Sequence, residues 1–398
     1  MTARALDAAR TRTLDAAVRK AHVLVTTGAG GVGKTTTAAA LGLAAARAGR
    51  RTLVLTIDPA RRLAQAMGLD ELTDEPRPVK LTASHTDSPG AADGGDEPDE
   101  PGELWAMMLD MQTTFDRLID RHATSVDNAR AIKSNRIYRT LSSTLSGTQE
   151  YMAMERLHEL HEAGEWELLV VDTPPTRSAL DFLDAPKRMT SFLEGRLLRL
   201  LLKPGVAAGK GVGRVVGAGA TAFMRVAGRV TGMELLQDLA DFFRNFEGMY
   251  DGFKQRADQV LGLLRDPDSQ FVVVTSPEPP PLREARFFLE RLEQEGLHDA
   301  GVVVNRVQPE LPRDPSAASL RRAIAKLDDE ATTEAQAAAY SLRLLDDVRN
   351  LAVRQRRDVA AALYGSDPSA LIEVPMLGRG VHDIHGLDAI ATCLTTGR

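Results

Sequence analysis

The residues best suited to chemistry form a glycine-rich stretch, Gly28-Ala29-Gly30-Gly31-Val32-Gly33-Lys34-Thr35. Its spacing fits the pattern G-x-x-x-x-G-K-[ST], in which glycines let successive backbone N–H groups approach a phosphate at a helix N-terminus. Lys34 is expected to contact the β- and γ-phosphates, and the Thr35 hydroxyl to coordinate Mg²⁺. The pattern therefore predicts a phosphate-binding loop, or P-loop, for a nucleoside triphosphate.

A carboxylate that can hold the metal follows a second apolar run. Asp172 comes directly after residues 168–171 and opens Asp172-Thr-Pro-Pro-Thr176. Hydrolysis requires such a carboxylate near the metal, so we expect Asp172 to hold Mg²⁺ together with Thr35, in the manner of a Walker B residue. A capping aspartate at a strand end is the structural alternative.

A second carboxylate, Asp58, follows the apolar run 52–57 and opens Asp58-Pro-Ala-Arg-Arg62. In a parallel sheet this position lies at the same carboxyl edge as the P-loop, where ligands bind. Asp58 is therefore the candidate catalytic residue, with the role of orienting the attacking water. The alternative is a helix N-cap before Pro59.

The segment Val302-Val-Val-Asn305-Arg-Val bears on the identity of the base. A guanine site usually carries an N/T-K-x-D-like segment after a late strand, and neither the lysine nor the aspartate is present here. Asn305 can donate to and accept from the adenine edge at once. These residues favour ATP over GTP, with a turn asparagine that contacts no ligand as the alternative.

The elements that must position these residues alternate between apolar runs and helix-length stretches. Continuous apolar runs indicate strands buried on both faces of a parallel sheet, and the Ala-rich stretch 34–47 indicates a helix that covers one face. The predicted fold class is α/β, a P-loop NTPase with a mostly parallel, doubly wound sheet and a helical subdomain insertion. The expected elements are a helix at 3–20 and strands at 22–27, 52–57, 168–171, 271–275, 302–304 and 371–374.

Composition limits the class of protein further. The chain has 398 residues, of which 43% are hydrophobic and 26% charged, which is typical of a soluble globular protein. A formal net charge of −6 provides no global basic field, so no nucleic-acid partner is expected. The single cysteine, Cys393, excludes an intramolecular disulfide and favours a cytoplasmic location, and the first twenty residues lack the apolar region of a secretion signal.

Two stretches interrupt the α/β alternation. Residues 82–103 are rich in acid, Pro and Gly without Lys or Arg, and we expect a disordered acidic surface loop. Residues 187–232 are basic and glycine-rich, with charges too frequent for a transmembrane helix. Contact with anionic lipid, a client-binding role and a solvated loop all remain open for the basic segment.

In these motifs the chain resembles the ArsA-type ATPases, a family that includes arsenite-pump ATPases and targeting factors for tail-anchored membrane proteins. The resemblance covers most of the chain, as a single P-loop ATPase domain over 1–398. It implies that the P-loop extends to Thr36, that Asp58 lies in the first switch and carries the hydrolytic role, and that Asn305 contacts adenine. The other matching segments are Asp172-Thr-Pro-Pro-Thr176 as the second switch, Thr275-Ser-Pro-Glu278 beside the adenine, and Val374-Pro-Met-Leu377, whose Pro375 closes over the base.

The resemblance also implies a partner and a client. Proteins of this family are dimers in which ATP binding closes helical subdomains into a groove, and the matching segments here are 104–165 and 184–255. Methionines at 107, 108, 111, 152 and 154 would pack in or flank that subdomain, where their adaptable side chains suit an apolar client, although core packing is the alternative. The expected client is a hydrophobic protein segment or another membrane-linked partner, with membrane association as a further prospect.

Three departures from the family pattern matter. Ala29 stands where the family usually has a second, signature lysine that reaches the partner's phosphates, so this chain lacks that cross-subunit charge. No Cys-x-x-Cys is present to share a zinc ion across a dimer. A trivalent arsenic site needs several thiolates, so Cys393 alone argues against arsenite transport.

Three hypotheses for function follow. The first is a dimeric Mg²⁺-dependent ATPase that handles a hydrophobic or membrane-linked client. The second is a low-turnover ATP-binding regulatory subunit, paired with a related chain that supplies the missing lysine. The third, a partition or positioning ATPase, is disfavoured by Ala29 and by the helical insertion. The paired histidines His158 and His161 lack the spacing of a metal motif, and a solvated charged face explains them.

Overall fold

The computed structural model describes residues 12–57, 62–81, 102–136, 138, 148–173, 250–312, 315–330, 332–363, 366, 368–378, 380–381 and 383–397. Several predicted features lie outside these ranges. They are Asp58, residues 82–101 of the acidic segment, Thr176 in the second switch, the basic segment 187–232, and most of the insertion at 184–255.

The centre of the molecule is an eight-stranded sheet with the order β3-β4-β2-β5-β1-β6-β7-β8. All neighbouring strands are parallel except β3, which pairs antiparallel with β4. This arrangement confirms the predicted α/β fold of a P-loop NTPase. The strands are β1 (Val23–Thr27), β2 (Thr52–Thr56), β3 (Arg77–Pro78), β4 (Leu104–Met108), β5 (Leu168–Asp172), β6 (Ser269–Thr275), β7 (His298–Val307) and β8 (Leu371–Pro375).

The central strands are buried on both faces, as their continuous apolar sequences predict. Every residue of β1, β2 and β5 is buried. β1 lies between β5 and β6, so the chain leaves β1 at the point where strand order reverses, which is where an open α/β sheet binds ligands. The sheet thus presents the loop after β1 at its carboxyl edge.

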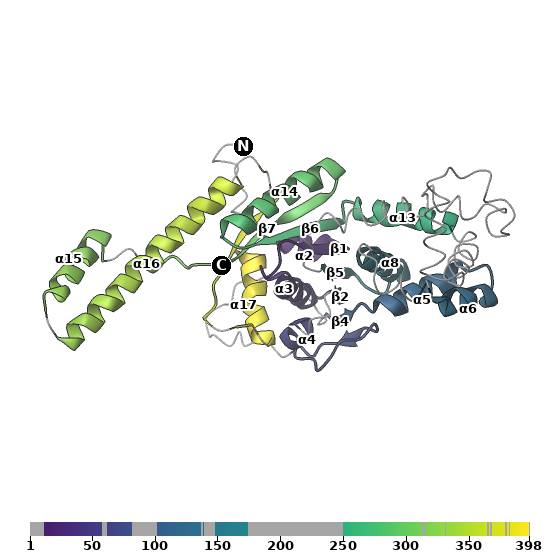
Figure 1. The fold of residues 1–398 in the computed structure, drawn as a ribbon, viewed down its shortest axis with the longest axis horizontal. Coiled ribbons are helices and arrows are strands. Elements are labelled where there is room, and N and C mark those ends of the chain that lie inside the picture. The colour runs from purple at the N-terminus through teal and green to yellow at the C-terminus, as the bar shows by residue number, and fades with distance from the viewer. Residues whose placement is uncertain are drawn as a thin grey trace, which may run out of the picture.

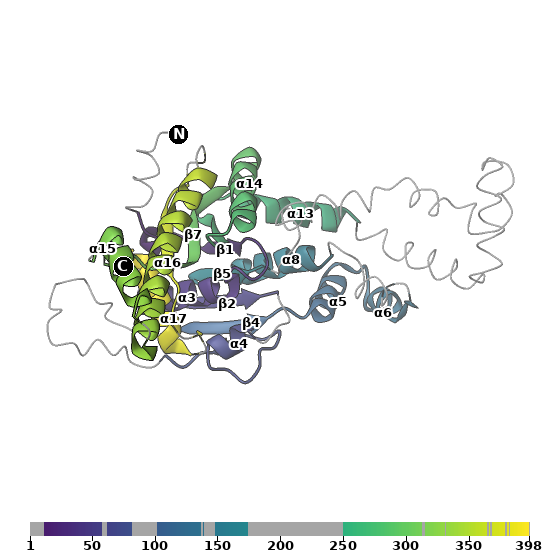
Figure 2. The same cartoon turned by 60° about the vertical axis from the view of Figure 1, so that its left-hand side comes forward.

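Helices cover both faces of the sheet (Figures 1 and 2). One apolar core joins the sheet to α2 (Asp15–Lys20), α3 (Lys34–Arg47), α4 (Arg62–Ala66) and α17 (Ile384–Thr396). The other core contains residues of α5 (Met111–His122), α6 (Val126–Ser134), α8 (Thr148–Ala163), α13 (Tyr250–Leu264) and α14 (Pro279–Glu295). We call these the α3 face and the α8 face.

Most of the methionines expected near a client-binding subdomain lie in the interior instead. Met107 of β4 and Met152 and Met154 of α8 are fully buried within the core of the α8 face. Met108 and Met111 are partly buried against the two cores. These side chains therefore fill core space, which supports the core-packing alternative over an open groove.

The segment 104–165 is not helical from its start. Its first five residues form β4, which pairs in register with β2 from Thr52↔Leu104 onward. At the end of the predicted acidic loop, Glu103 is described and its carboxylate lies 3.1 Å from the Arg51 guanidinium. Ordered structure in this region is therefore present before the end of the loop that the sequence predicted at residues 82–103.

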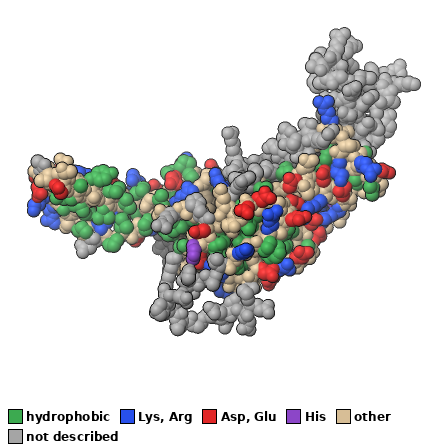
Figure 3. All heavy atoms as spheres, turned by 90° about the horizontal axis from the view of Figure 1, so that it is seen from below, with side chains coloured by type: hydrophobic (Ala, Val, Ile, Leu, Met, Phe, Trp, Pro, Cys, Tyr) green, Lys and Arg blue, Asp and Glu red, His purple; other side chains and the backbone are tan. Residues whose placement is uncertain are grey.

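The segment between β7 and β8 in the sequence forms a helical hairpin of α15 (Ala317–Asp328) and α16 (Thr333–Ala362). This hairpin extends from the body of the molecule (Figure 1). The two helices pack against each other, and α16 also contacts α14. Figure 3 shows hydrophobic side chains gathered on this hairpin, and Tyr340, Leu344 and Val353 are exposed there. Among the described helices, none has both the length and the apolar character that crossing a bilayer requires.

Candidate nucleotide-binding site

Two positions in the loop between β1 and α3 have backbone conformations that only glycine readily adopts. Gly28 has φ +145°, and a Cβ there would lie 1.9 Å from the carbonyl oxygen of Val274. Gly33 has φ +105° and forms the N-cap of α3. Both are conformations that L side chains rarely adopt, so the glycines at these positions are required by the path of the loop.

Lys34 begins α3 and its side chain turns back over the loop. Its Nζ donates hydrogen bonds to the carbonyl oxygens of Gly28 and Ala29, each at 3.0 Å, and the residue is 6% exposed. The ammonium group is therefore held within the curve of the loop, where a phosphate chain would meet it. Gly30, Gly31 and Val32 complete the curve between these contacts.

Asn305 lies near the carboxyl end of β7, and its side chain hydrogen-bonds to the P-loop. Its Nδ2 donates to the carbonyl oxygen of Val32 at 2.8 Å, and its Oδ1 accepts from the backbone N–H of Arg306 at 3.0 Å. A Cβ on Gly33 would lie 2.2 Å from the Asn305 amide nitrogen, so the contact also depends on that glycine. The structure thus places Asn305 at the site, in direct contact with the P-loop.

Asp172 is the last residue of β5 and is fully buried. Its Oδ2 accepts a hydrogen bond from the Thr56 hydroxyl at 2.9 Å, and its carbonyl oxygen accepts from the Ile57 N–H at 3.2 Å. The strand register aligns Asp172 with Thr26 of β1 and with Thr56 of β2. The carboxylate is therefore fixed beneath the P-loop by the two strands that flank it.

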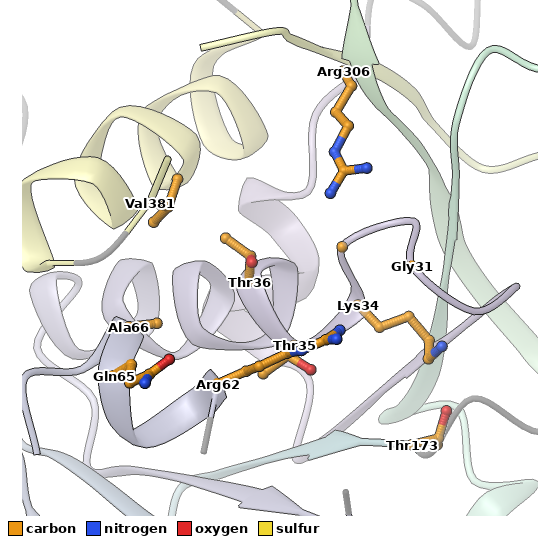
Figure 4. Close-up of a pocket in the computed structure, with 11 residues that line it drawn as sticks. Gly31, Lys34, Thr35, Thr36, Arg62, Gln65, Ala66, Thr173, Arg306 and Val381 are labelled. Atoms are coloured by element: carbon orange, nitrogen blue, oxygen red, sulfur yellow. The ribbon is translucent and has the colours of Figure 1, made fainter. Parts of the chain in front are cut away.

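A cavity of about 480 Å³ opens over the P-loop (Figure 4). Its described lining combines hydroxyl groups, cations and backbone N–H groups and includes no acidic side chain. Thr173 lines the cavity directly beyond Asp172, which is not itself among the lining residues. The lining residues are Gly31, Gly33, Lys34, Thr35, Thr36, Arg62, Gln65, Ala66, Thr173, Arg306 and Val381.

A second cavity of about 440 Å³ adjoins the first, and both are lined by Gly33, Thr36, Arg306 and Val381. Its remaining lining is largely apolar and comes from the ends of β7 and β8 and from α17. Asn305, Val374, Pro375, Met376, Leu377, Gly378, Gly380 and Ile390 form this part. The two cavities together offer a cationic compartment beside one whose lining is partly apolar.

The oxygen ligands expected for Mg²⁺ are compatible with that ion. The Thr35 hydroxyl lines the first cavity, and the Asp172 carboxylate lies at the same sheet edge with one oxygen bonded to Thr56. Magnesium binds hard oxygen ligands and usually takes only one or two from the protein, together with phosphate oxygens and water. The donor set is thus of the right chemical type.

The histidines of α8 lie elsewhere. His158 is buried, which corrects the expectation of a solvated face at this position, and its Nδ1 lies 3.4 Å from a Glu162 carboxylate oxygen. The rings of His161 and His22 are tilted, with their centroids 6.4 Å apart. Within the described ranges, no three His, Cys, Asp or Glu side chains are grouped to hold a metal ion.

The sequence analysis proposed the P-loop, Asp172, Asn305 and Pro375 as site residues but did not name two arginines. Arg62 and Arg306 both line the P-loop cavity, and Figure 4 shows Arg306 extending from β7 toward the loop. Each stands in a segment already singled out, four residues after Asp58 and directly after Asn305. Their place in the cavity depends on the sheet order, which no local pattern records.

The fold and this site together define a P-loop NTPase. Residues 21–334 match the anion-transporting ATPase (ArsA) family, and the chain belongs to that family.

Among relatives, the chain is 30% identical over 365 residues to the uncharacterized protein SCO2128 of Streptomyces coelicolor, covering 91% of this chain and 81% of that protein. It is 25% identical over 296 residues to putative arsenical pump-driving ATPase 1 of Aquifex aeolicus, covering 73% of this chain and 64% of that protein. It is 26% identical over 305 residues to the ATPase GET3C of Arabidopsis thaliana, covering 74% of this chain and 69% of that protein.

Proposed function

We propose that this protein is a Mg²⁺-dependent ATP hydrolase whose nucleotide lies across the two adjoining cavities. The observation that carries the proposal is the P-loop itself, with Lys34 held in its curve and a cavity of about 480 Å³ above it. Membership of an ATPase family and the names of its relatives support the same activity.

In this proposal the phosphates occupy the first cavity. Backbone N–H groups of Gly30, Gly31, Val32, Gly33 and Thr36 surround them, and Lys34 turns from the loop carbonyls toward the β- and γ-phosphates. Thr35 and Asp172 hold Mg²⁺. When bound, that ion neutralises charge that develops on the phosphate oxygens.

The base then lies in the second cavity, between the Asn305 amide and Pro375. The apolar lining from Met376, Leu377 and Ile390 suits a planar base, and Asn305 supplies the polar edge for adenine. The amide already bonds Val32, so its second N–H and the remaining acceptor capacity of Oδ1 serve the base.

Asp58 orients the attacking water. Although Asp58 lies outside the described residues, it directly follows Ile57, whose N–H binds the Asp172 carbonyl at the metal end of the site. A carboxylate at this point in the chain would accept a hydrogen bond from a water in line with the terminal phosphate.

Nucleotide-driven switching in a dimer, acting on a hydrophobic or membrane-linked client, is the broader role that we propose. A specific residue favours a second candidate, a regulatory subunit with little turnover. Ala29 adds no charge to the P-loop, so a related chain would have to supply a lysine for fast hydrolysis.

The test is ATP hydrolysis by the purified full chain, with its mass in solution recorded alongside. We expect Lys34→Ala to abolish nucleotide binding, and Asp58→Asn to retain binding but lower kcat by about 100-fold or more. Asp329→Asn, an exposed carboxylate at the end of α15, is the matched control and should change neither.

Two results separate the candidates. Turnover in the wild type that disappears in Asp58→Asn supports an enzyme active in its own right. Tight ATP binding without turnover, with turnover gained in Ala29→Lys, supports the regulatory subunit. A wild-type chain that binds no nucleotide would contradict both.

A further inference from the structure

The P-loop cavity contains two arginines whose guanidinium groups have no partner in the described part of the chain. Arg62 begins α4 and Arg306 follows Asn305 in β7, and both are exposed to the cavity that they line. Many of the other described arginines are paired with a carboxylate, as Arg356 is with Glu373 at 3.0 Å. Two free cations that face a cavity without a described acidic side chain indicate an anionic ligand.

The backbone at Arg306 is built to aim its side chain. Its φ is +63°, and Arg306 is alone among the described non-glycine residues in having a positive φ. The register between β7 and β8 shifts at this point, between Asn305 and Val307. A bulge of this kind turns a side chain out of the strand pattern, and an unfavourable conformation retained beside a cavity points to function.

The neighbouring residue stabilises this backbone conformation of Arg306, because the Asn305 Oδ1 accepts a hydrogen bond from the Arg306 N–H at 3.0 Å. The same asparagine bonds the P-loop through Val32. Arg306 is thus fixed relative to the loop, and Figure 4 shows its guanidinium directed toward Gly31 and Thr36.

Strand order gives the two arginines different positions along a bound nucleotide. The base cavity lies at the ends of β7 and β8, whereas the expected metal ligand Asp172 ends β5, beside β2. Arg306 lines both cavities, and Arg62, which follows β2, lines only the first. Arg306 therefore lies toward the base, and Arg62 toward the terminal phosphate.

We propose that Arg306 binds the phosphates common to ADP and ATP, and that Arg62 binds the terminal phosphate and so distinguishes ATP from ADP. The proposal rests on the proposed function, because it assumes that the nucleotide runs from the base cavity to the metal end. It assigns both contacts to this chain alone, in a P-loop where Ala29 contributes no charge.

Calorimetric titration of the full chain with ADP and with a non-hydrolysable ATP analogue, both with Mg²⁺, tests the assignment. Arg306→Gly removes the guanidinium and suits the positive φ, so folding is preserved. It should weaken both ligands about tenfold, the effect of one charge-assisted hydrogen bond. Arg306→Lys should retain part of the affinity, since it keeps the charge without the planar fork.

Arg62→Ala should weaken the ATP analogue about tenfold and leave ADP within about twofold. The matched control is Arg354→Ala, an exposed arginine on α16 outside both cavities, which should change neither affinity. Thermal melting confirms that each variant is folded.

Arg306 is tested further by salt. Raising KCl from about 0.05 M to about 0.3 M should weaken ADP binding more in the wild type than in Arg306→Gly, because a phosphate contact is screened. An equal salt dependence would place the guanidinium on the base and overturn its phosphate role.

Affinities within about twofold of wild type in Arg306→Gly would likewise overturn the role of Arg306, and equal weakening of both ligands in Arg62→Ala would overturn that of Arg62. Lys34→Ala separates these failures from a failure of the proposed function. If Lys34→Ala loses all binding while the arginine variants behave as wild type, the P-loop function stands and this inference fails. If the wild type binds neither ligand, the proposed function itself fails.

Discussion

The two faces of the sheet are built on different principles. On the α3 face, α3 has six alanines among its fourteen residues, eleven of its residues are buried, and the helix contacts β1, β2 and β5. On the α8 face, Arg256 of α13 is 8% exposed and donates to Glu155 of α8, itself 3% exposed, at 2.6 Å, and to Glu162 at 2.9 Å. One face is packed with small side chains, and the other adds a buried ion pair to its apolar core.

The difference in packing matches the elements that each face holds in place, which are the P-loop helix on one face and α8 with α13 on the other. Small side chains let α3 approach the sheet closely, which fixes the helix whose N-terminus forms the P-loop. A buried ion pair adds little net stability, but it fixes the relative position of its two helices because any other placement leaves a charge unpaired. The ion pair joins α8 to α13, the first described element after residues 174–249.

The largest effect is expected from breaking the buried pair. Arg256→Met leaves the Glu155 carboxylate buried without its partner, and should lower the free energy of unfolding by about 3–5 kcal/mol in urea denaturation at pH 7. Burial already raises the pKa of Glu155 despite the opposing effect of Arg256, so the variant should bind a proton there more readily.

The double variant Arg256→Met/Glu155→Leu should recover most of that loss. The control is Arg286→Met on α14, whose pair with Glu290 at 2.9 Å is exposed, and it should cost under about 1 kcal/mol. Equal losses in the buried and exposed pairs would contradict the contrast between the faces.

A matched pair of helical glycines compares the faces more directly. A Cβ on Gly42 of α3 would lie 2.4 Å from Val54 Cγ2, so Gly42→Ala should destabilise the protein by about 1–3 kcal/mol through overpacking. Gly262 of α13 has open space, and Gly262→Ala should stabilise it by about 0.5 kcal/mol through helix propensity. Denaturation of both variants measures the signs, and a stabilising Gly42→Ala would show that the α3 face has room to adjust.

A smaller effect is expected from pH on the α8 face. Burial, and next the charge of Arg256, lower the pKa of His158 below its ordinary value. The unfolded chain then binds a proton at a higher pH than the folded chain, so this contribution to stability is present above about pH 6.5 and is lost as the pH falls.

The measurement is the difference in unfolding free energy between wild type and His158→Gln at several pH values. Between about pH 7 and about pH 5, the wild type should lose stability relative to the variant, by about 1.4 kcal/mol for each unit by which the histidine pKa differs between the folded and unfolded chain. A relative gain for the wild type on acidification would mean that the folded protein stabilises the charged imidazole.

The sequence predicted those parts of the fold that local patterns determine. The helix at 34–47 has the predicted bounds, because the P-loop glycines fix its start and alanine continues it. β4 was not predicted: its five residues follow the acidic segment, and their extended state depends on pairing with β2. β7 was predicted only at its centre, since His298 and Arg306 at its ends are exposed and polar.

For the site, the sequence predicted residue types better than contacts. Lys34 and Thr35 were predicted because one short motif contains them. The bond from Asn305 to Val32 depends on β7 lying two strands from β1, and the aim of Arg306 depends on a bulge. Both are products of tertiary packing, which the spacing of residues in one sequence does not encode.

The Asn305 side chain reaches from β7 past β6 to the loop after β1, and this geometry has a mechanical consequence. One hydrogen bond, from Asn305 to Val32, connects the base cavity to the P-loop. A displacement of either partner should therefore shift the other. The protein's own hydrogen bonds from Lys34 and Asn305 hold the loop, so part of its conformational entropy is lost during folding. Less ordering of the loop then has to accompany binding, which lowers the entropic cost of association.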